Sequence, residues 1–164
     1  MKKFLSVLFI LILFIFSNCN SNKKRIEKNI LAKYSDSLDI DSIASYFYLK
    51  KDYVISENLY SNLIFLSKST GMNYYRLAYS NLKNEKFVPA IYNFKMSVAL
   101  DYKKFQSYLN ISCCYAVIHK DSIAIEYAKN ALAIDSNSQK AKNIIEICQK
   151  ELQKKYQKFI PIFI

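Results

Sequence analysis

The chain has 164 residues and a mass of 19.2 kDa, the size of one ordinary domain. Hydrophobic residues make up 52% of it, yet it contains only one Gly, two Pro and no Trp. A sheet-rich fold needs more turn residues and a phosphate-binding loop needs more glycines. The composition therefore excludes both and indicates an all-helical chain.

The formal net charge is +11 at neutral pH. Lys, Asn, Ile, Tyr and Phe are abundant while Gly and Ala are scarce, a bias that an AT-rich gene also produces. The lysines are scattered along the chain and do not follow one face, so we expect a solvated surface and no nucleic-acid partner. An attraction to anionic surfaces remains physically reasonable.

Residues 1–18 have the layout of an export signal. Lys2 and Lys3 precede an apolar run over 4–16, which as a helix is about 20 Å long and too short to span a bilayer of about 30 Å. Small or polar residues then lead to Cys19, and this ending resembles the lipobox of bacterial lipoproteins, although Phe16 and Asn18 depart from the usual pattern.

That resemblance implies cleavage before Cys19, lipid on the Cys19 thiol, and an exported protein held in the bacterial cell envelope, facing the outer membrane or periplasm. The alternatives are an ordinary secreted protein or an uncleaved anchor. Residues 19–36 then predict a polar tether followed by a leading helix, because apolar residues recur at helical spacing from Ile26 onward.

A 34-residue period organises the next part of the chain into units over 37–70, 71–104 and 105–138. Columns of like residues align at this step: Ile43, Leu77, Ile111 and Ile145; the small residues Ala44, Ala78 and Ser112; and the small residues Ser56, Ala90 and Ala124. Within each unit, helical spacing stops at a short polar turn and then resumes. Each unit therefore predicts two helices that pack closely through the small columns.

Residues 139–158 predict a closing helix with a polar outer side, as the end of a stacked array requires. The last six residues, 159–164, form an apolar tail too short to cross a membrane. The tail either packs on the last helix, touches a membrane, or is the stub of a longer transmembrane segment. In the last case the chain is the periplasmic sensor part of a truncated membrane-bound signalling protein.

The repeated motif resembles the tetratricopeptide repeat. Three units and the closing helix carry it, through residues such as Leu77-Ala78, Phe87, Ala90, Phe94 and Leu100-Asp101. The sequence departs from the family in three turn positions where Gly is expected, which hold Lys51, Glu85 and His119. The resemblance implies an all-α, right-handed superhelical stack of antiparallel helix pairs, a tetratricopeptide-like α-solenoid.

In that family the first helix of each unit lines a concave face that binds peptides. The resemblance places the following predicted partner-binding residues there: Tyr48, Met72, Tyr75, Tyr79, Leu82 and Leu109. The Lys and Asn clamp with which some members hold a terminal carboxylate is absent, because the matching positions hold Asp41, Ser45, Tyr75 and Tyr79. What remains is aromatic and aliphatic, which suits a peptide or helix.

The sequence gives little support for a catalytic function. Cys113 and Cys114 could be paired with His119, the only His, but no third orienting group is evident. We therefore predict no catalytic residues, no metal site, no cofactor, and free, largely buried thiols. The sequence favours a non-enzymatic module that binds another protein or peptide; the sensor remains the main alternative, and a cysteine hydrolase is remote.

Overall fold

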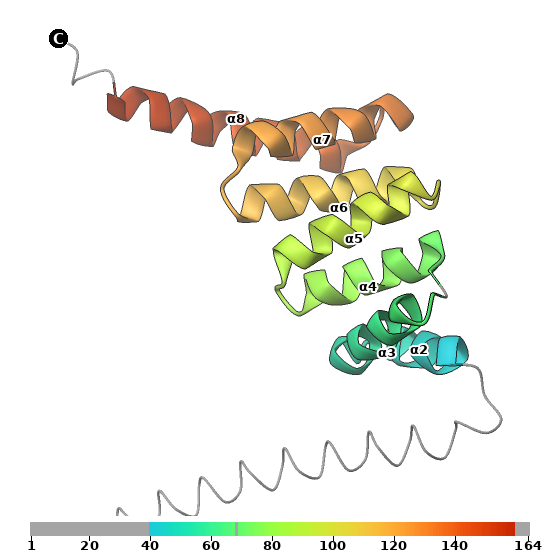
Figure 1. Cartoon of the computed structure of the whole chain (residues 1–164). Helices are drawn as coiled ribbons and strands as arrows, with labels where there is room; N and C mark the ends of the chain where they lie inside the picture. The colour runs from blue at the N-terminus through green and yellow to red at the C-terminus, as the bar shows by residue number, and fades with distance from the viewer. Residues whose placement is uncertain (1–39, 68, 160–164) are drawn as a thin grey trace, which may run out of the picture. The chain divides into compact units, whose positions relative to one another are not determined.

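The computed structural model describes residues 40–67 and 69–159 of the chain. Their helices are α2 (Ile40–Leu49), α3 (Tyr53–Phe65), α4 (Gly71–Lys83), α5 (Phe87–Ala99), α6 (Lys104–Val117), α7 (Asp121–Ile134) and α8 (Gln139–Phe159) (Figure 1). These described ranges contain no strand. The predicted all-α class is confirmed, whereas the export signal, tether and leading helix lie outside the described residues.

The helices are stacked in chain order as antiparallel pairs. The chain divides into a unit that ends at Ile43, described only in the opening turn of α2, and a unit that begins at Ala44 and holds the stack. Within the stack α4 packs on α5 and α6 on α7, and each pair contacts the next (Figure 1). The second helices α3, α5 and α7 begin at Tyr53, Phe87 and Asp121, which reproduces the 34-residue period.

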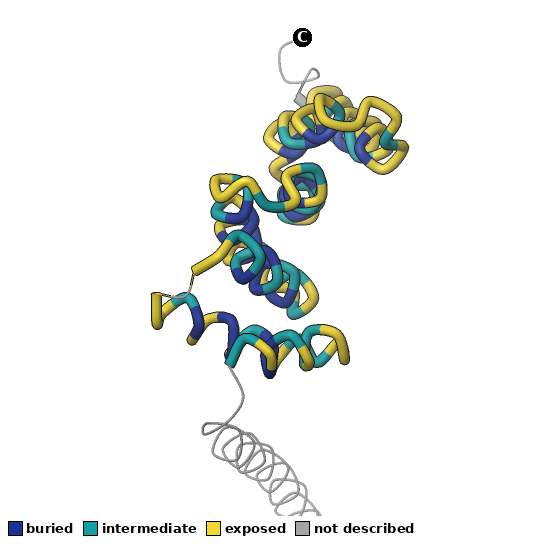
Figure 2. Tube along the Cα trace, turned by 90° about the vertical axis from the view of Figure 1, so that its right-hand side faces the viewer, coloured by how far each residue is buried: buried dark blue, intermediate teal, exposed yellow. Residues whose placement is uncertain are grey.

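Small residues lie where paired helices touch. Ala78, Ala90 and Ala124 are completely buried, and the hydroxyl of Ser112 on α6 donates to the carbonyl of Ala124 on α7 at 2.8 Å. Helix axes can approach to about 8 Å only across such small side chains. The buried stretches in Figure 2 accordingly lie on the sides of the helices that face their neighbours.

Large side chains fill the space between neighbouring pairs. Tyr60 and Phe94 are fully buried, and one cluster joins Phe94 to Ile91 on its own helix and to Ile111 and Cys114 on α6. Burying each such side chain contributes roughly 1.5–3 kcal/mol relative to an exposed one. The core is therefore shared between units, and a helix pair alone would leave half of it open to water.

The turns inside the helix pairs share one unusual backbone geometry. Lys51, Glu85 and His119, 34 residues apart, have φ of 62°, 60° and 57°. In the second of these turns the Glu85 N–H donates to the Leu82 carbonyl and the Lys86 N–H to the Asn81 carbonyl, the bond pattern of a Schellman cap. Such a cap needs a left-handed residue, so these positions explain the family's preference for Gly.

The only glycine serves a different purpose, because its φ is not positive. Gly71 begins α4, and a Cβ there would lie 2.5 Å from the Cβ of Tyr102. That separation is far inside van der Waals contact. Gly71 therefore lets the start of α4 approach the α5–α6 connection closely.

The last helix closes the stack through an ion pair as well as apolar contact. The ammonium of Lys155 on α8 lies 2.5 Å from a carboxylate oxygen of Asp121, whose side chain is only 3% exposed. Ala141 and Cys148 supply the buried side of α8, and its outer side carries exposed pairs such as Glu146–Lys150. None of the described helices combines the length and the apolar character that crossing a membrane requires.

Replacing Glu85 by Gly should stabilise the fold. The side chain is exposed, and a Cβ in the left-handed region costs roughly 1–2 kcal/mol. The greater entropy of Gly in the unfolded chain offsets part of this benefit. We therefore expect the free energy of unfolding of Glu85→Gly to exceed that of Glu85→Ala by about 1 kcal/mol. Urea denaturation of the two variants measures this difference, and equal midpoints would contradict the assignment of strain to this turn.

Candidate functional site

Three tyrosines from three successive helices form what we call the tyrosine surface: Tyr48 on α2, Tyr53 on α3 and Tyr79 on α4. Their ring centroids lie 6.2 Å (Tyr48–Tyr53), 5.8 Å (Tyr48–Tyr79) and 5.8 Å (Tyr53–Tyr79) apart, all in edge-to-face arrangements. Each side chain is half-buried. The three rings therefore hold one another in place while leaving part of each ring accessible to solvent.

Tyr75 packs against this surface from the side of the hydrophobic core. Its ring stacks on Tyr79 at 6.4 Å and meets the edges of Phe94 at 5.5 Å and Tyr102 at 5.9 Å. Only 8% of Tyr75 is exposed, so this residue belongs to the core. Its position links the tyrosine surface to the packing between the second and third helix pairs.

Cations border the same rings. The Arg76 guanidinium lies 5.6 Å from the Tyr48 centroid, the Lys83 ammonium 5.3 Å from Tyr79, and the Lys103 ammonium 5.0 Å from Tyr75. Each distance falls within the roughly 6 Å over which a cation is attracted to a ring face. The tyrosine surface therefore has an aromatic centre with positive charge beside it.

Arg76 is the residue that sequence reasoning missed. Its Nη1 donates to the Ser45 hydroxyl at 2.5 Å and to the hydroxyl of the fully buried Tyr60 at 2.8 Å. It thereby connects α4 to both helices of the preceding pair. One signal pointed to it: the chain has only two arginines, Arg25 and Arg76, among 24 basic residues, and Arg is favoured over Lys where several fixed hydrogen bonds are needed.

Burial changes the acid–base behaviour of the tyrosines. Burial is the largest factor that raises the pKa of Tyr48, followed by repulsion from an ionised Tyr75, Tyr79 or Tyr53, while Arg76 acts in the opposite direction. Burial also raises the pKa of Tyr75. At neutral pH both hydroxyls are protonated, as an unshifted tyrosine would be, so the upward shifts matter only at alkaline pH.

The structure brings together only some of the predicted partner-binding residues. Tyr48 contacts Tyr79, and Tyr79 contacts Tyr75. Met72, Leu82 and Leu109 are half-buried on the first helices, and Leu82 packs beside Tyr79 against the core. Tyr53, which is not among the predicted partner-binding residues, also belongs to the surface. The binding role of these residues stays a prediction, and Cys19 lies outside the described residues.

The cysteines carry free thiols in the described part of the chain. Burial raises the pKa of Cys113, and it raises that of Cys114 to about 12. A nucleophilic cysteine needs the opposite shift, because the thiolate is the reactive form. His119 is exposed in its turn, so the geometry does not favour the hydrolase alternative.

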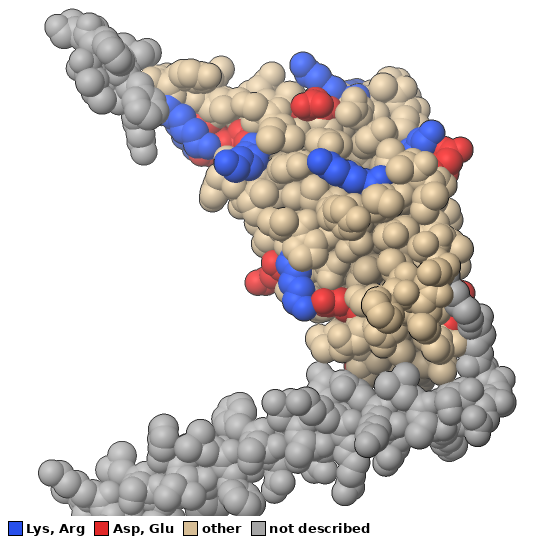
Figure 3. All heavy atoms as spheres, in the orientation of Figure 1, with Lys and Arg blue, Asp and Glu red and all other residues tan. Residues whose placement is uncertain are grey.

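Over residues 40–67 and 69–159 no three His, Cys, Asp or Glu side chains gather in a way that could hold a metal ion. Charged side chains on the face shown in Figure 3 are sparse, and lysines often lie beside carboxylates there. One such pair joins Lys86 to Glu57 across neighbouring helix pairs at 2.7 Å. No continuous basic stripe follows this face.

The raised pKa of Tyr48 predicts a loss of stability at alkaline pH. In the unfolded chain Tyr ionises near pH 10, whereas folded Tyr48 still holds its proton there, so the free energy of unfolding falls as pH rises above about 10. Tyr48→Phe should make this fall shallower above about pH 10 in denaturant titrations. Tyr92→Phe, at a ring that is 62% exposed, is the control and should leave the slope unchanged; equal slopes for both variants would contradict the assignment.

Comparison with protein-family models finds no match, and comparison with curated proteins finds none either. Solved structures do match. The Arabidopsis OM64 TPR domain has a TM-score of 0.61 and 19% identity, over 68% of this chain and 93% of that one. MamA has a TM-score of 0.66 and 16% identity, over 84% and 76% of the two chains.

A third match is the first TPR of Spaghetti (RPAP3), bound to the HSP90 peptide SRMEEVD. It has a TM-score of 0.60 and 15% identity, over 70% of this chain and 93% of that one. At such low identity these matches speak to the fold alone. The described part of the chain has the all-α solenoid fold of tetratricopeptide repeat domains.

Proposed function

We propose that the chain is a non-enzymatic protein–protein interaction module. It is anchored in the bacterial cell envelope through lipid on Cys19, and it captures a segment of another protein on the tyrosine surface. The observation that carries the proposal is the packing of Tyr48, Tyr53 and Tyr79 from three helices into one half-exposed group.

Tyrosines arranged in this way suit binding for two physical reasons. A Tyr ring offers a large apolar area with a polar tip, and Tyr is enriched among the residues that dominate binding energies. Rings already held by their neighbours lose little conformational freedom when a partner arrives, which lowers the entropic cost of association. The Tyr48 hydroxyl is protonated at neutral pH and is available as a donor.

The charge beside the rings favours an acidic partner segment. Arg76, Lys83 and Lys103 each lie within 6 Å of one of the rings Tyr48, Tyr79 and Tyr75. Complementary charge accelerates association and fixes the register of a bound peptide. A segment with apolar residues among carboxylates fits such a surface. The RPAP3 domain of the same fold, bound to an HSP90 peptide, supports peptide capture as a use of this architecture.

The tyrosine surface can be tested by photo-crosslinking in the living cell. A photoreactive phenylalanine replaces Met72 or Leu82, which are half-buried on the same helix as Tyr79. We expect a discrete adduct with one protein at these positions. Tyr79→Ala should reduce its yield at least tenfold, because truncating a central aromatic residue typically costs about 2 kcal/mol or more.

Two controls make the result specific. The same photoreactive residue at Val88 or Tyr92, which are exposed on α5 outside the tyrosine surface, should give no such adduct. Tyr79 is preferred to Tyr75 for truncation, because Tyr75 lies in the core and its loss would cost about 3–5 kcal/mol of stability. Equal adducts at all four positions, or none at any, would refute capture on this surface.

The lipid anchor is tested separately. Cells grown with labelled palmitate should incorporate the label into the chain, and Cys19→Ala should abolish incorporation and release the protein from the membrane fraction. Cys113→Ala is the control and should retain the label. Unchanged labelling in Cys19→Ala would exclude lipid attachment at that residue.

A further inference from the structure

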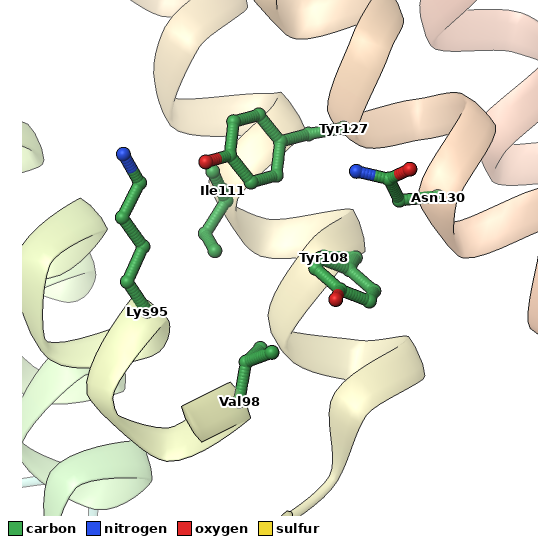
Figure 4. A pocket seen from close by; sticks show the side chains of 6 residues that line it. All are labelled: Lys95, Val98, Tyr108, Ile111, Tyr127 and Asn130. Carbon is green, nitrogen blue, oxygen red and sulfur yellow. The ribbon is translucent and has the colours of Figure 1, made fainter.

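A cavity of about 220 Å³ lies among α5, α6 and α7 and shares no residue with the tyrosine surface. It is lined by Lys95, Val98, Tyr108, Ile111, Tyr127 and Asn130 (Figure 4). Its volume lies a little below the range of about 300–1,000 Å³ that is usual for ligand pockets, so it suits a small molecule or a single side chain.

Two stacked tyrosines hold the Lys95 ammonium at this cavity. The rings of Tyr115 and Tyr127 lie 5.5 Å apart at an interplanar angle of 25°, and the Lys95 Nζ is 5.7 Å and 5.4 Å from their centroids. The Nζ also donates to the Tyr115 hydroxyl at 3.2 Å. Hydrogen bonding to Tyr127, and then to Tyr115, raises the pKa of Lys95. The ammonium, which is charged at neutral pH like that of any lysine, therefore lies beside two aromatic rings at this cavity.

The rest of the lining is apolar with a few polar groups. Ile111 is fully buried, and Figure 4 shows it between Lys95 and Tyr108, below Tyr127, whose hydroxyl points toward the ammonium. The ring centroids of Tyr108 and Tyr127 lie 6.2 Å apart, and Asn130 contributes an amide to the lining. An apolar base with a small number of converging polar groups is the usual composition of a ligand site.

We infer that this cavity binds a carboxylate that carries a small apolar body. Lys95 is the only charged residue of the lining, so one carboxylate balances it, whereas a phosphate dianion would bring an uncompensated charge. The Tyr127 hydroxyl, which points toward the ammonium in Figure 4, can donate to the second carboxylate oxygen. The carboxylate belongs either to a free small acid or to an acidic side chain of a protein, since both present the same chemistry.

The inference is tested by NMR titration of the isotope-labelled full-length chain with benzoate. We expect saturable shifts confined to the residues around Tyr108, Ile111 and Tyr127, with a Kd of about 1 mM for so small a ligand. Benzamide has the same shape without the charge and should bind at least tenfold more weakly. Equal binding of benzamide and benzoate, or the absence of saturable shifts, would overturn the proposal.

Matched variants test whether the Lys95 ammonium is the charge that binds the carboxylate. Lys95→Met should weaken benzoate binding at least tenfold, whereas Lys129→Met, at an exposed lysine on the same helix as Tyr127, should leave it unchanged. Because Lys95 is exposed, the Lys95→Met variant should melt at the wild-type temperature. Tyr127→Phe is a second variant, which removes the hydroxyl at the cavity and keeps the aromatic ring. Undiminished binding in a folded Lys95→Met variant would overturn the assignment.

A second ligand separates the two sources of the carboxylate. Glutamate blocked at both its amino and α-carboxyl groups represents an acidic side chain of a protein. Tighter binding of benzoate supports a free small acid, and tighter binding of blocked glutamate supports a protein side chain. Failure of both ligands to bind would refute the site, and it would leave the crosslinking result at the tyrosine surface unaffected.

Discussion

The close approach of paired helices is the constraint on which the rest of this structure depends. Ala78, Ala90 and Ala124 are completely buried, and Ser112 bonds directly to the backbone beside Ala124. A larger side chain at any of these positions would separate the two helices of a pair and displace every pair beyond it. The recurrence of small residues every 34 positions therefore determines how closely successive helices of the stack can pack.

The two candidate sites lie where large side chains pack, outside the helix-pair seams that the small residues occupy. Because the seam of each pair is occupied by Ala and Ser, several tyrosines of the described helices pack at the junctions between pairs. Tyr48, Tyr53 and Tyr79 meet at one such junction, and Tyr115 and Tyr127 border the cavity at another. In both places long cationic side chains lie across the rings, Arg76 in the first and Lys95 in the second. The two sites have the same elements, aromatic rings and a fixed cation, in different shapes.

Much of the fold could be predicted from the sequence, because its information is local and periodic. The step of 34 residues and the alternation of apolar spacing with polar turns sufficed for the helix pairs and for the solenoid class. The candidate sites were harder to predict from the sequence. Arg76 and Lys95 act through long flexible side chains that reach another helix, and no spacing rule specifies where such a side chain ends. Tyr75 shares a face with Tyr79 in the sequence pattern, yet the neighbouring Phe94 and Tyr102 bury one and leave the other half-exposed.

The ion pair of Asp121 with Lys155 has a consequence for the order in which the protein forms. The carboxylate is buried at the first residue of α7, but its cation lies 34 residues further along the chain, on α8. A buried charge without its partner costs about 3–5 kcal/mol, a large share of the stability of an ordinary domain. Until Lys155 is available, the Asp121 carboxylate has to stay in water, so the third helix pair remains open on the side that α8 covers. The third helix pair thus acquires its final packing later in synthesis than the second pair, because α8 follows α6 and α7 in the chain.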